Sequence, residues 1–193
     1  MYSFFAMMAR MKYIERWALM RSASRENICE HSLEVAMLAH ALAIISNEKC
    51  GNKLDVNQVA MMGLYHDANE IITGDMPTPV KYFDEDIKED YKRVEDMASL
   101  TMLNKLPDYM KKYYEPLMLP KEGAEYEWKL VKAADKLSAL IKCQEELRAG
   151  NPEFRTAEQT ILQTLKKMSM KEIEIFMLDF LPAYDRTLDE LQK

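Results

Sequence analysis

Residues that break helices are scarce in this chain, and this scarcity constrains its fold more than any other feature of the sequence. Only 5 Gly and 7 Pro occur among 193 residues, 48% of which are hydrophobic, and strongly β-branched runs are absent. Intrinsic propensity therefore favours helix over sheet along the whole chain. A chain of this length can bury a large core as one domain. We expect an all-α fold in which residues 1–193 form a single domain.

Apolar side chains that recur with a 3.6-residue period predict about seven helices. The expected ranges are 2–17, 30–47, 55–71, 84–105, 107–117, 126–149 and 153–190, the last of them broken near Ser169. Asp55 is expected to cap the third helix, and Gly150 and Pro152 are expected to stop the sixth. Apolar residues cover most of the circumference of the sixth segment, which predicts a central, largely buried helix.

Two of these segments carry a one-sided apolar stripe, which predicts that both helices face a shared core. In the last segment the stripe consists of Ile173, Phe176, Met177, Phe180, Leu181 and Tyr184. In the second segment it consists of Leu33, Met37, His40, Ala41 and Ile44. His40 is therefore expected to be a hydrogen-bonded core residue and not a metal ligand.

The chain is acidic, with a formal net charge of −6 that is spread along its length. Bulk electrostatics therefore do not attract a nucleic acid polymer, and a phosphate-bearing substrate would need a local cation, either a metal or a specific Arg or Lys. The three cysteines show no CxxC spacing. This argues against a disulfide framework or zinc ribbon and fits a reducing cytoplasm. No apolar stretch approaches about 18 residues, so we expect neither a membrane span nor a signal peptide.

Only three histidines occur, so each can be weighed separately. His66 stands beside Asp67 at the end of an apolar helix, a pair that often arises by chance. The signal becomes specific when His31, at the start of another helix, and Asp135, inside the buried sixth segment, are added. Two imidazoles and two carboxylates suit one divalent ion such as Mn, Fe, Co or Zn, and leave positions open for water and a phosphate oxygen.

A carboxylate such as Asp135 amid apolar neighbours is costly unless it is paired or bound to metal. The alternative to a ligand role is an ion pair with Lys132 or Arg148. Glu70 follows Asp67 by three residues, so in a continuous helix it would lie on the same face and near the metal. There it could orient or deprotonate a water whose pKa the metal lowers. The alternative for Glu70 is a solvated carboxylate at a helix end.

Arg16 offers a planar fork that can grip phosphate through two hydrogen bonds. Trp17 can pack flat on a deoxyribose, where a ribose 2′-hydroxyl would leave a polar group stranded against the indole. Asp75 could accept a hydrogen bond from the sugar 3′-hydroxyl or position the attacking water, and both roles stay open. Lys81 is either a second phosphate contact or a solvated lysine.

Several blocks together closely resemble the bacterial HD-domain 5′-deoxynucleotidases. They are Arg16-Trp17, Glu30-His31-Ser32-Leu33, Tyr65-His66-Asp67, Glu70, the loop Gly74-Asp75-Met76-Pro77-Thr78-Pro79-Val80-Lys81-Tyr82-Phe83, and Lys132-Ala133-Ala134-Asp135. The likeness covers nearly the whole chain, and the loop is far more specific than the bare His-Asp pair. It implies a single-domain, HD-type helical bundle with the metal site between helices. It also implies a homodimeric enzyme that removes phosphate from 2′-deoxynucleoside 5′-monophosphates.

The resemblance also implies roles for individual residues. The metal ligands would be His31, His66, Asp67 and Asp135, holding one divalent ion, Co or Mn, with Zn, Fe, Ni or Cu also compatible. Glu70 and Asp75 would serve catalysis. Substrate would be contacted by Arg16, Trp17, His31, Asp67, Asp75, Met76, Pro77, Thr78, Lys81 and Asp135, with Arg16 and Trp17 disfavouring a ribose 2′-hydroxyl.

Three other functions remain open at this stage. The first is hydrolysis of another phosphoester, either a cyclic nucleotide or a guanosine alarmone. Alarmone hydrolases usually follow the His-Asp pair with adjacent Glu-Asp, whereas this chain has Glu70-Ile71. The second is a non-catalytic nucleotide sensor, against which the presence of Glu70 and Asp75 speaks. The third is a di-iron HD oxygenase, which would require more histidine ligands than this chain offers.

Overall fold

The computed structural model describes residues 1–77, 80 and 83–192, and within them every regular element is helical. The α-helices are α1 (Phe4–Met8), α2 (Ile28–Cys50), α3 (Val56–Tyr65), α4 (Glu70–Thr73), α6 (Glu85–Leu103), α7 (Asp108–Met118), α8 (Glu125–Arg148), α9 (Arg155–Met168), α10 (Lys171–Asp179) and α11 (Leu188–Leu191). Short 3-10 segments are η1 (Met11–Tyr13), η2 (Pro152–Phe154) and η3 (Leu181–Asp185). The all-α prediction is confirmed, and the single domain stays a prediction.

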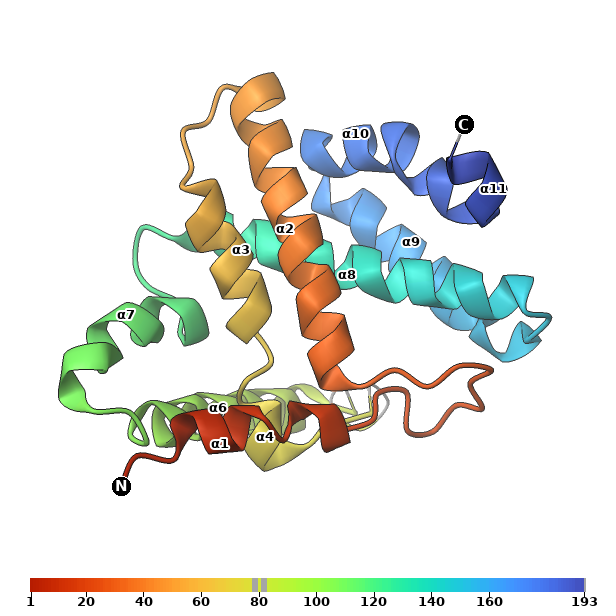
Figure 1. The fold of residues 1–193 in the computed structure, drawn as a ribbon. Coiled ribbons are helices and arrows are strands. Elements are labelled where there is room, and N and C mark those ends of the chain that lie inside the picture. The colour runs from red at the N-terminus through yellow and green to blue at the C-terminus, as the bar shows by residue number, and fades with distance from the viewer. Residues whose placement is uncertain (78–79, 81–82, 193) are drawn as a thin grey trace.

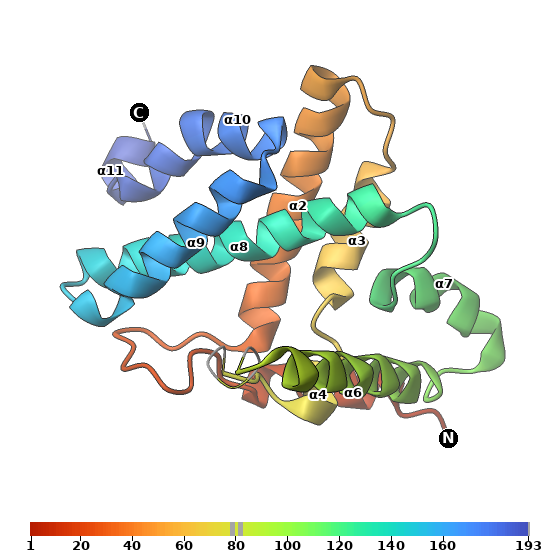
Figure 2. The same cartoon turned by 180° about the vertical axis from the view of Figure 1, so that it is seen from behind.

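Two long helices, α2 and α8, cross at the centre of the molecule (Figure 1). The views from front and back show α3 beside α2 and α9 beside α8 (Figure 2). The main buried cluster joins α2, α3, α8, α9 and α10, which confirms the central position predicted for the 126–149 segment. A smaller cluster joins α1, α6 and α7 below it.

Helices α2 and α3 approach each other closely because Gly63 has no side chain. A Cβ at this position would lie 3.0 Å from the Ala36 Cα and 3.1 Å from the Val35 carbonyl oxygen. Both neighbours are backbone atoms, which cannot move aside without shifting a helix. The close contact brings the end of α3 against the first half of α2.

The N-terminal segment departs most from prediction. The helix expected over 2–17 is wrong, because α1 and η1 are short and residues 14–27 form an irregular segment, the N-terminal loop. Its ends are joined by a hydrogen bond from the Ile28 N–H to the Ile14 carbonyl at 3.0 Å. Trp17 has a φ of 61°, a left-handed conformation that bulky residues rarely adopt. Helical periodicity cannot reveal such long-range pairing.

The helix expected over 55–71 is wrong in its last part. Helix α3 ends at Tyr65, residues 66–69 form turns, and α4 begins at Glu70. In a continuous helix the adjacent His66 and Asp67 would point about 100° apart. Tighter turns replace the helix here, with hydrogen bonds from the Ala68 N–H to the Tyr65 carbonyl and from the Glu70 N–H to the Asp67 carbonyl, each at 3.0 Å.

The remaining predicted helices match α2, α6, α7 and α8 to within a few residues. The Asp55 side chain caps α3 by accepting hydrogen bonds from two backbone N–H groups at 3.0 Å. Gly150, with a φ of 82°, follows α8, and Ser169, with a φ of 50°, separates α9 from α10. The segment expected over 153–190 is broken a second time, at η3.

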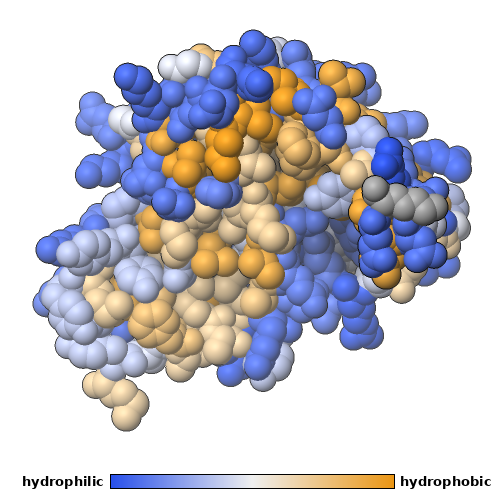
Figure 3. All heavy atoms as spheres, turned by 45° about the horizontal axis from the view of Figure 1, so that its top comes forward, coloured by the Kyte–Doolittle hydropathy of each residue, from blue (hydrophilic) through white to orange (hydrophobic). Residues whose placement is uncertain are grey.

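The stripe predicted to be the buried face of α2 is instead exposed to solvent. Leu33, Met37 and Ile44 are 56%, 59% and 42% exposed, whereas Val35 and Leu42 are fully buried. Because α2 is apolar on more than one face, periodicity alone cannot tell which face meets the core. Figure 3 shows apolar side chains gathered over the middle of one face of the molecule.

His40, on the same stripe, is half-buried, so its assignment as a core residue is only partly right. The stripe predicted in the last segment is largely buried. Ile173, Phe176 and Leu181 lie in the core, although Phe180 is 48% exposed. The two stripes therefore do not face one shared core, as expected from sequence.

Helix α2 is long and apolar enough to cross a membrane, which corrects the expectation that no stretch of the chain reaches that length. Half of its most apolar window is buried inside the protein. Its buried residues pack in the main cluster with α3, α8 and α10. The central helix of a packed core passes the same test of length and hydropathy.

Candidate metal centre and substrate contacts

Four side chains from separate elements converge at one point, and together they form the His–Asp cluster. His31 lies in the first turn of α2, His66 follows α3, Asp67 lies in the next turn, and Asp135 lies in α8. The Asp67 Oδ2 lies 3.1 Å from the His66 Nε2 and 3.5 Å from the His31 Nε2. The Asp135 Oδ1 lies 3.3 Å from the His31 Nε2. The structure thus brings together all four residues that the sequence singled out.

This cluster has the donor set of a divalent metal site. One ligand-type atom from each of His31, His66 and Asp67 lies within 4.8 Å of the others. Both Nε2 atoms are buried, and neither makes a hydrogen bond within the described part of the chain. Each Nε2 instead faces a carboxylate oxygen, at 3.3 Å for His31 and 3.1 Å for His66, and a metal bound between them would satisfy the buried nitrogens and the carboxylates together. The residues present fit one divalent transition ion.

The charges in the cluster favour the metal-binding protonation states of His31 and Asp67, whereas His66 must release a proton to bind a metal. Burial and the positive charge of Arg16 lower the pKa of His31, which favours the neutral ring. Burial opposes protonation of His66, but the adjacent Asp67 outweighs it and raises the pKa of His66. Burial also opposes ionisation of Asp67, yet the two histidines lower its pKa to about 2.

Asp135 is paired within the site and not with the partners that were considered as its alternative. Its carboxylate lies 3.0 Å from the Lys136 Nζ as well as beside His31. Although burial opposes ionisation, Lys136 and His31 together hold the pKa of Asp135 well below its ordinary value. Neither Lys132 nor Arg148 forms a recorded ion pair with this carboxylate in the described part of the chain.

Each of the two imidazole rings is oriented by a contact at its Nδ1 atom, the ring nitrogen that does not face the carboxylates of the cluster. The His66 Nδ1 lies 2.7 Å from the carbonyl oxygen of Gly63. The His31 Nδ1 lies 3.0 Å from the hydroxyl of Ser138, which in turn donates to the Glu34 Oε2 at 2.6 Å. Sequence reasoning missed Ser138 and Glu34, although each follows a predicted ligand by three residues, a spacing that puts both on one helix face.

The two predicted catalytic residues are Glu70, which is hydrogen-bonded to Asp67 through its backbone, and Asp75, whose carboxyl group is influenced by the charges of Asp67 and His31. Glu70 is buried at the start of α4, and its backbone N–H donates to the Asp67 carbonyl at 3.0 Å. Asp75 is half-buried, and burial raises its pKa while the charge of Arg16 opposes that rise. The Asp75 carboxylate accepts a hydrogen bond from the backbone N–H of Trp17.

Of the other predicted contacts in this loop, Met76 and Pro77 are half-buried next to Asp75. Thr78 and Lys81 lie outside the described residues.

Arg16 and Trp17 are held by a residue that sequence reasoning did not single out. The Glu26 Oε2 accepts a hydrogen bond from the Arg16 guanidinium at 3.1 Å and another from the Trp17 indole N–H at 2.8 Å. The Trp17 ring also packs against Phe154, with 5.2 Å between ring centroids. Burial opposes the charge of Arg16, but the carboxylates of Glu26 and Asp135 outweigh it and raise the pKa of Arg16.

A buried ion pair within α8 holds the N-terminal loop through hydrogen bonds to the loop backbone. The Lys142 Nζ lies 2.5 Å from the Glu146 Oε1 and 2.6 Å from the Ser24 carbonyl oxygen. Glu146 also accepts hydrogen bonds from the backbone N–H of Ala23 at 2.7 Å and from the Asn151 amide at 2.8 Å. Burial opposes its ionisation, but these donors lower the pKa of Glu146 to about 2. The loop that carries Arg16 is therefore held against α8 at Ala23 and Ser24.

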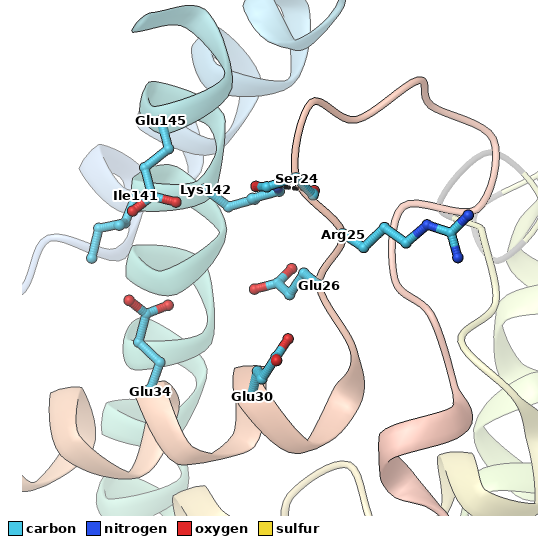
Figure 4. Close-up of a pocket in the computed structure, with 8 residues that line it drawn as sticks. All are labelled: Ser24, Arg25, Glu26, Glu30, Glu34, Ile141, Lys142 and Glu145. Atoms are coloured by element: carbon cyan, nitrogen blue, oxygen red, sulfur yellow. Dashed lines mark hydrogen bonds between the residues drawn. The ribbon is translucent and has the colours of Figure 1, made fainter. Parts of the chain in front are cut away.

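A cavity of about 250 Å³ lies between the N-terminal loop, the start of α2 and α8. Figure 4 shows four carboxylates directed toward this space, while Arg25 turns away from it. They belong to Glu26, Glu30, Glu34 and Glu145. Glu26 is the residue that holds Arg16 and Trp17, and Glu34 is the residue that accepts the hydrogen bond of the Ser138 hydroxyl.

Residues 3–184 match the family described as 5′-deoxynucleotidase YfbR-like. The chain is 45% identical over 188 residues to a 5′-deoxynucleotidase of Vibrio atlanticus, with 97% of each chain covered. This chain belongs to the YfbR-like 5′-deoxynucleotidase family. It is also 45% identical to the 5′-deoxynucleotidase YfbR of Salmonella paratyphi B, covering 98% of this chain and 96% of that relative. The family and the class of enzyme predicted from the sequence are confirmed.

Solved structures give the same fold for this YfbR-like chain. An HD-domain phosphohydrolase from Listeria innocua aligns with a TM-score of 0.80 at 22% identity, covering 94% of this chain and 88% of that one. The cyanophage S-2L HD phosphohydrolase DatZ, solved with dA and one catalytic Zn²⁺ ion, aligns with a TM-score of 0.64 at 21% identity, covering 94% and 96%. These likenesses confirm the HD-type helical fold.

Proposed function

We propose that this chain hydrolyses 2′-deoxynucleoside 5′-monophosphates to deoxynucleoside and phosphate at the His–Asp cluster. The observation that carries the proposal is the pair of buried Nε2 atoms of His31 and His66, which face carboxylates in a member of a 5′-deoxynucleotidase family. One divalent ion, held by the four residues of the cluster, completes the site. Co or Mn is the proposed metal, and Zn, which DatZ contains, is a further candidate for this donor set.

When bound, such an ion lowers the pKa of a water molecule and stabilises negative charge on phosphoryl oxygens. The chain's own residues bind and orient the substrate around it. Glu70, buried and one turn from Asp67, takes the role of orienting or deprotonating the attacking water. Its burial excludes competing solvent contacts from the carboxylate.

Arg16 supplies the local cation that an acidic chain needs to hold a phosphate. One edge of its guanidinium is held by Glu26, which fixes the direction of the side chain. Trp17 packs on the deoxyribose, and Glu26 fixes the indole in that position. Asp75, joined to the Trp17 backbone, either contacts the 3′-hydroxyl or positions the water.

We also propose that the enzyme is a cytoplasmic homodimer. The exposed apolar side chains of α2, Leu33, Met37 and Ile44, support an interface, because scattered apolar residues need no explanation but a contiguous stripe does. Light scattering on the purified protein measures the mass directly. A mass of one chain, 22.5 kDa, contradicts the dimer.

One assay tests the proposed activity. Purified protein with Mn²⁺ or Co²⁺ is given a panel of deoxy- and ribonucleoside monophosphates, cyclic nucleotides and alarmones, and free phosphate is measured. We expect release from dAMP and dTMP but not from AMP. Equal rates on AMP and dAMP would remove the role of Trp17, and turnover of only cyclic nucleotides or alarmones would replace the proposed substrate class.

A further inference from the structure

The two histidines of the cluster are oriented by partners of different chemical kinds. The His66 Nδ1 faces a backbone carbonyl, which can only accept a hydrogen bond, so Nδ1 carries a proton whatever the state of Nε2. The His31 Nδ1 faces the hydroxyl of Ser138, which can either donate or accept. Contact with Ser138 alone therefore leaves the tautomer of His31 undetermined.

A third residue removes this ambiguity. The Ser138 hydroxyl has one proton and donates it to the Glu34 Oε2 at 2.6 Å. The oxygen can then only accept from the His31 Nδ1, which leaves Nε2 with the lone pair that faces the cluster. His31 and Ser138 are both 0% exposed, so bulk water does not take over either contact.

We propose that Glu34, acting through Ser138, is a positioning residue that fixes His31 in the tautomer whose Nε2 faces the cluster. The relay joins the two helices that carry ligands, since Glu34 follows His31 on α2 and Ser138 follows Asp135 on α8. Partners behind a metal ligand typically change metal affinity or activity by about 10- to 100-fold when removed. The proposal rests on the metal role given above to His31.

The carboxylate of Glu34 lies at the wall of the acidic cavity (Figure 4). Burial raises the pKa of Glu34, the Ser138 hydroxyl opposes that rise, and Glu26 and Glu145 add to it. Glu145 lines the same cavity and makes no recorded hydrogen bond to Ser138 in the described part of the chain. Glu145→Ala is therefore a matched control that removes an equal charge from the same cavity and keeps both hydrogen bonds of the relay.

Imidazole NMR of the metal-free protein tests the tautomer directly. The chain has only three histidines, so long-range ¹H–¹⁵N spectra resolve each ring, and a His40→Gln variant assigns the third. We expect His31 to be protonated at Nδ1 in the wild type and in Glu145→Ala. In Glu34→Ala we expect a mixture of tautomers. An unchanged His31 signature in folded Glu34→Ala overturns the proposal.

Calorimetry with Mn²⁺ or Co²⁺ tests the route by which Glu34 acts. Glu34→Ala and Ser138→Ala should each weaken metal binding about 10- to 100-fold. The double variant should be no weaker than Ser138→Ala, because Glu34 acts through the hydroxyl. A further loss in the double variant shows direct action of the Glu34 charge and overturns the relay.

Glu34 is half-buried, so Glu34→Ala is expected to fold even if truncation at fully buried Ser138 is not tolerated. The NMR comparison of Glu34→Ala with Glu145→Ala then decides the proposal. Failure of the wild type to bind Mn²⁺ or Co²⁺ would contradict the proposed function. The tautomer measurement in the metal-free protein would still decide the relay.

Discussion

The His–Asp cluster and the N-terminal loop meet at one site but are built in different ways. The cluster takes its residues from the ends and middles of packed helices, where the close approach of α2 and α3 at Gly63 fixes their spacing. The loop carries Arg16 and Trp17 on irregular backbone, held by the half-buried carboxylate of Glu26 and the buried carboxylate of Glu146. Helix packing thus positions the proposed metal ligands, and side-chain hydrogen bonds position the proposed substrate contacts.

Because of this difference, we expect substitutions in the cluster and substitutions in the loop to have different effects. Changes in the cluster should remove the chemistry and leave recognition in place. Changes in the loop should alter recognition and local stability and leave metal binding in place. Each of the following variants tests one side of this division.

The largest effect is expected from His66→Ala and Asp135→Ala. Removing either side chain deletes one donor of the proposed metal site and leaves a buried group beside it without its partner. Phosphate release and metal binding should both fall below detection. Calorimetry with Mn²⁺ that shows wild-type affinity in Asp135→Ala would remove this residue from the set of ligands.

Glu70→Gln should lose turnover while keeping the metal. The amide has nearly the shape of the carboxylate but cannot act as a base, and such a loss typically lowers rate about 100- to 10,000-fold. The measurement pairs kcat on dAMP with metal affinity. A wild-type kcat would transfer the role to Asp75, for which Asp75→Asn is the parallel variant.

Glu26→Ala should act on recognition. Without this carboxylate the Arg16 fork and the Trp17 indole lose their shared acceptor. We expect the preference for dAMP over AMP, measured as the ratio of kcat/KM, to fall roughly tenfold, which corresponds to about 1.4 kcal/mol. Metal affinity should stay within twofold of wild type, roughly 0.4 kcal/mol. An unchanged ratio would show that Trp17 keeps its position without Glu26.

The smallest effect is expected from the pH dependence of the loop anchor. Because the folded pKa of Glu146 is lowered to about 2 from 4.5, its contribution to stability is present above about pH 4.5 and is lost as the pH falls toward 2. The Tm difference between wild type and Glu146→Gln should therefore shrink over that interval. A difference that stays constant with pH would show that ionisation of Glu146 does not stabilise the fold.

The sequence predicted the cluster better than the loop for a physical reason. His31, His66, Asp67 and Asp135 are recognisable because a metal requires those residue types, and their helices follow from periodicity. Trp17 lies in a left-handed conformation and contacts Asp75 and Phe154, which are far along the chain. The helix and strand propensities of neighbouring residues cannot predict such contacts.

Two other features show where periodicity stops being informative. Helix α2 is apolar on several faces, so its pattern did not reveal that Leu33 and Met37 face solvent. Ser138 is not a typical metal ligand and Glu34 is one of many acidic residues in the chain, so their spacing from Asp135 and His31 gains meaning only once α2 and α8 are known to cross. The residues that converge in the cluster were therefore predictable, and the groups that orient them were not.

Anomalous diffraction from crystals grown with Mn²⁺ or Co²⁺ tests the central claim most directly. We predict one strong peak bonded to the Nε2 atoms of His31 and His66 and to carboxylate oxygens of Asp67 and Asp135. A peak elsewhere, or one that excludes Asp135, would contradict the account.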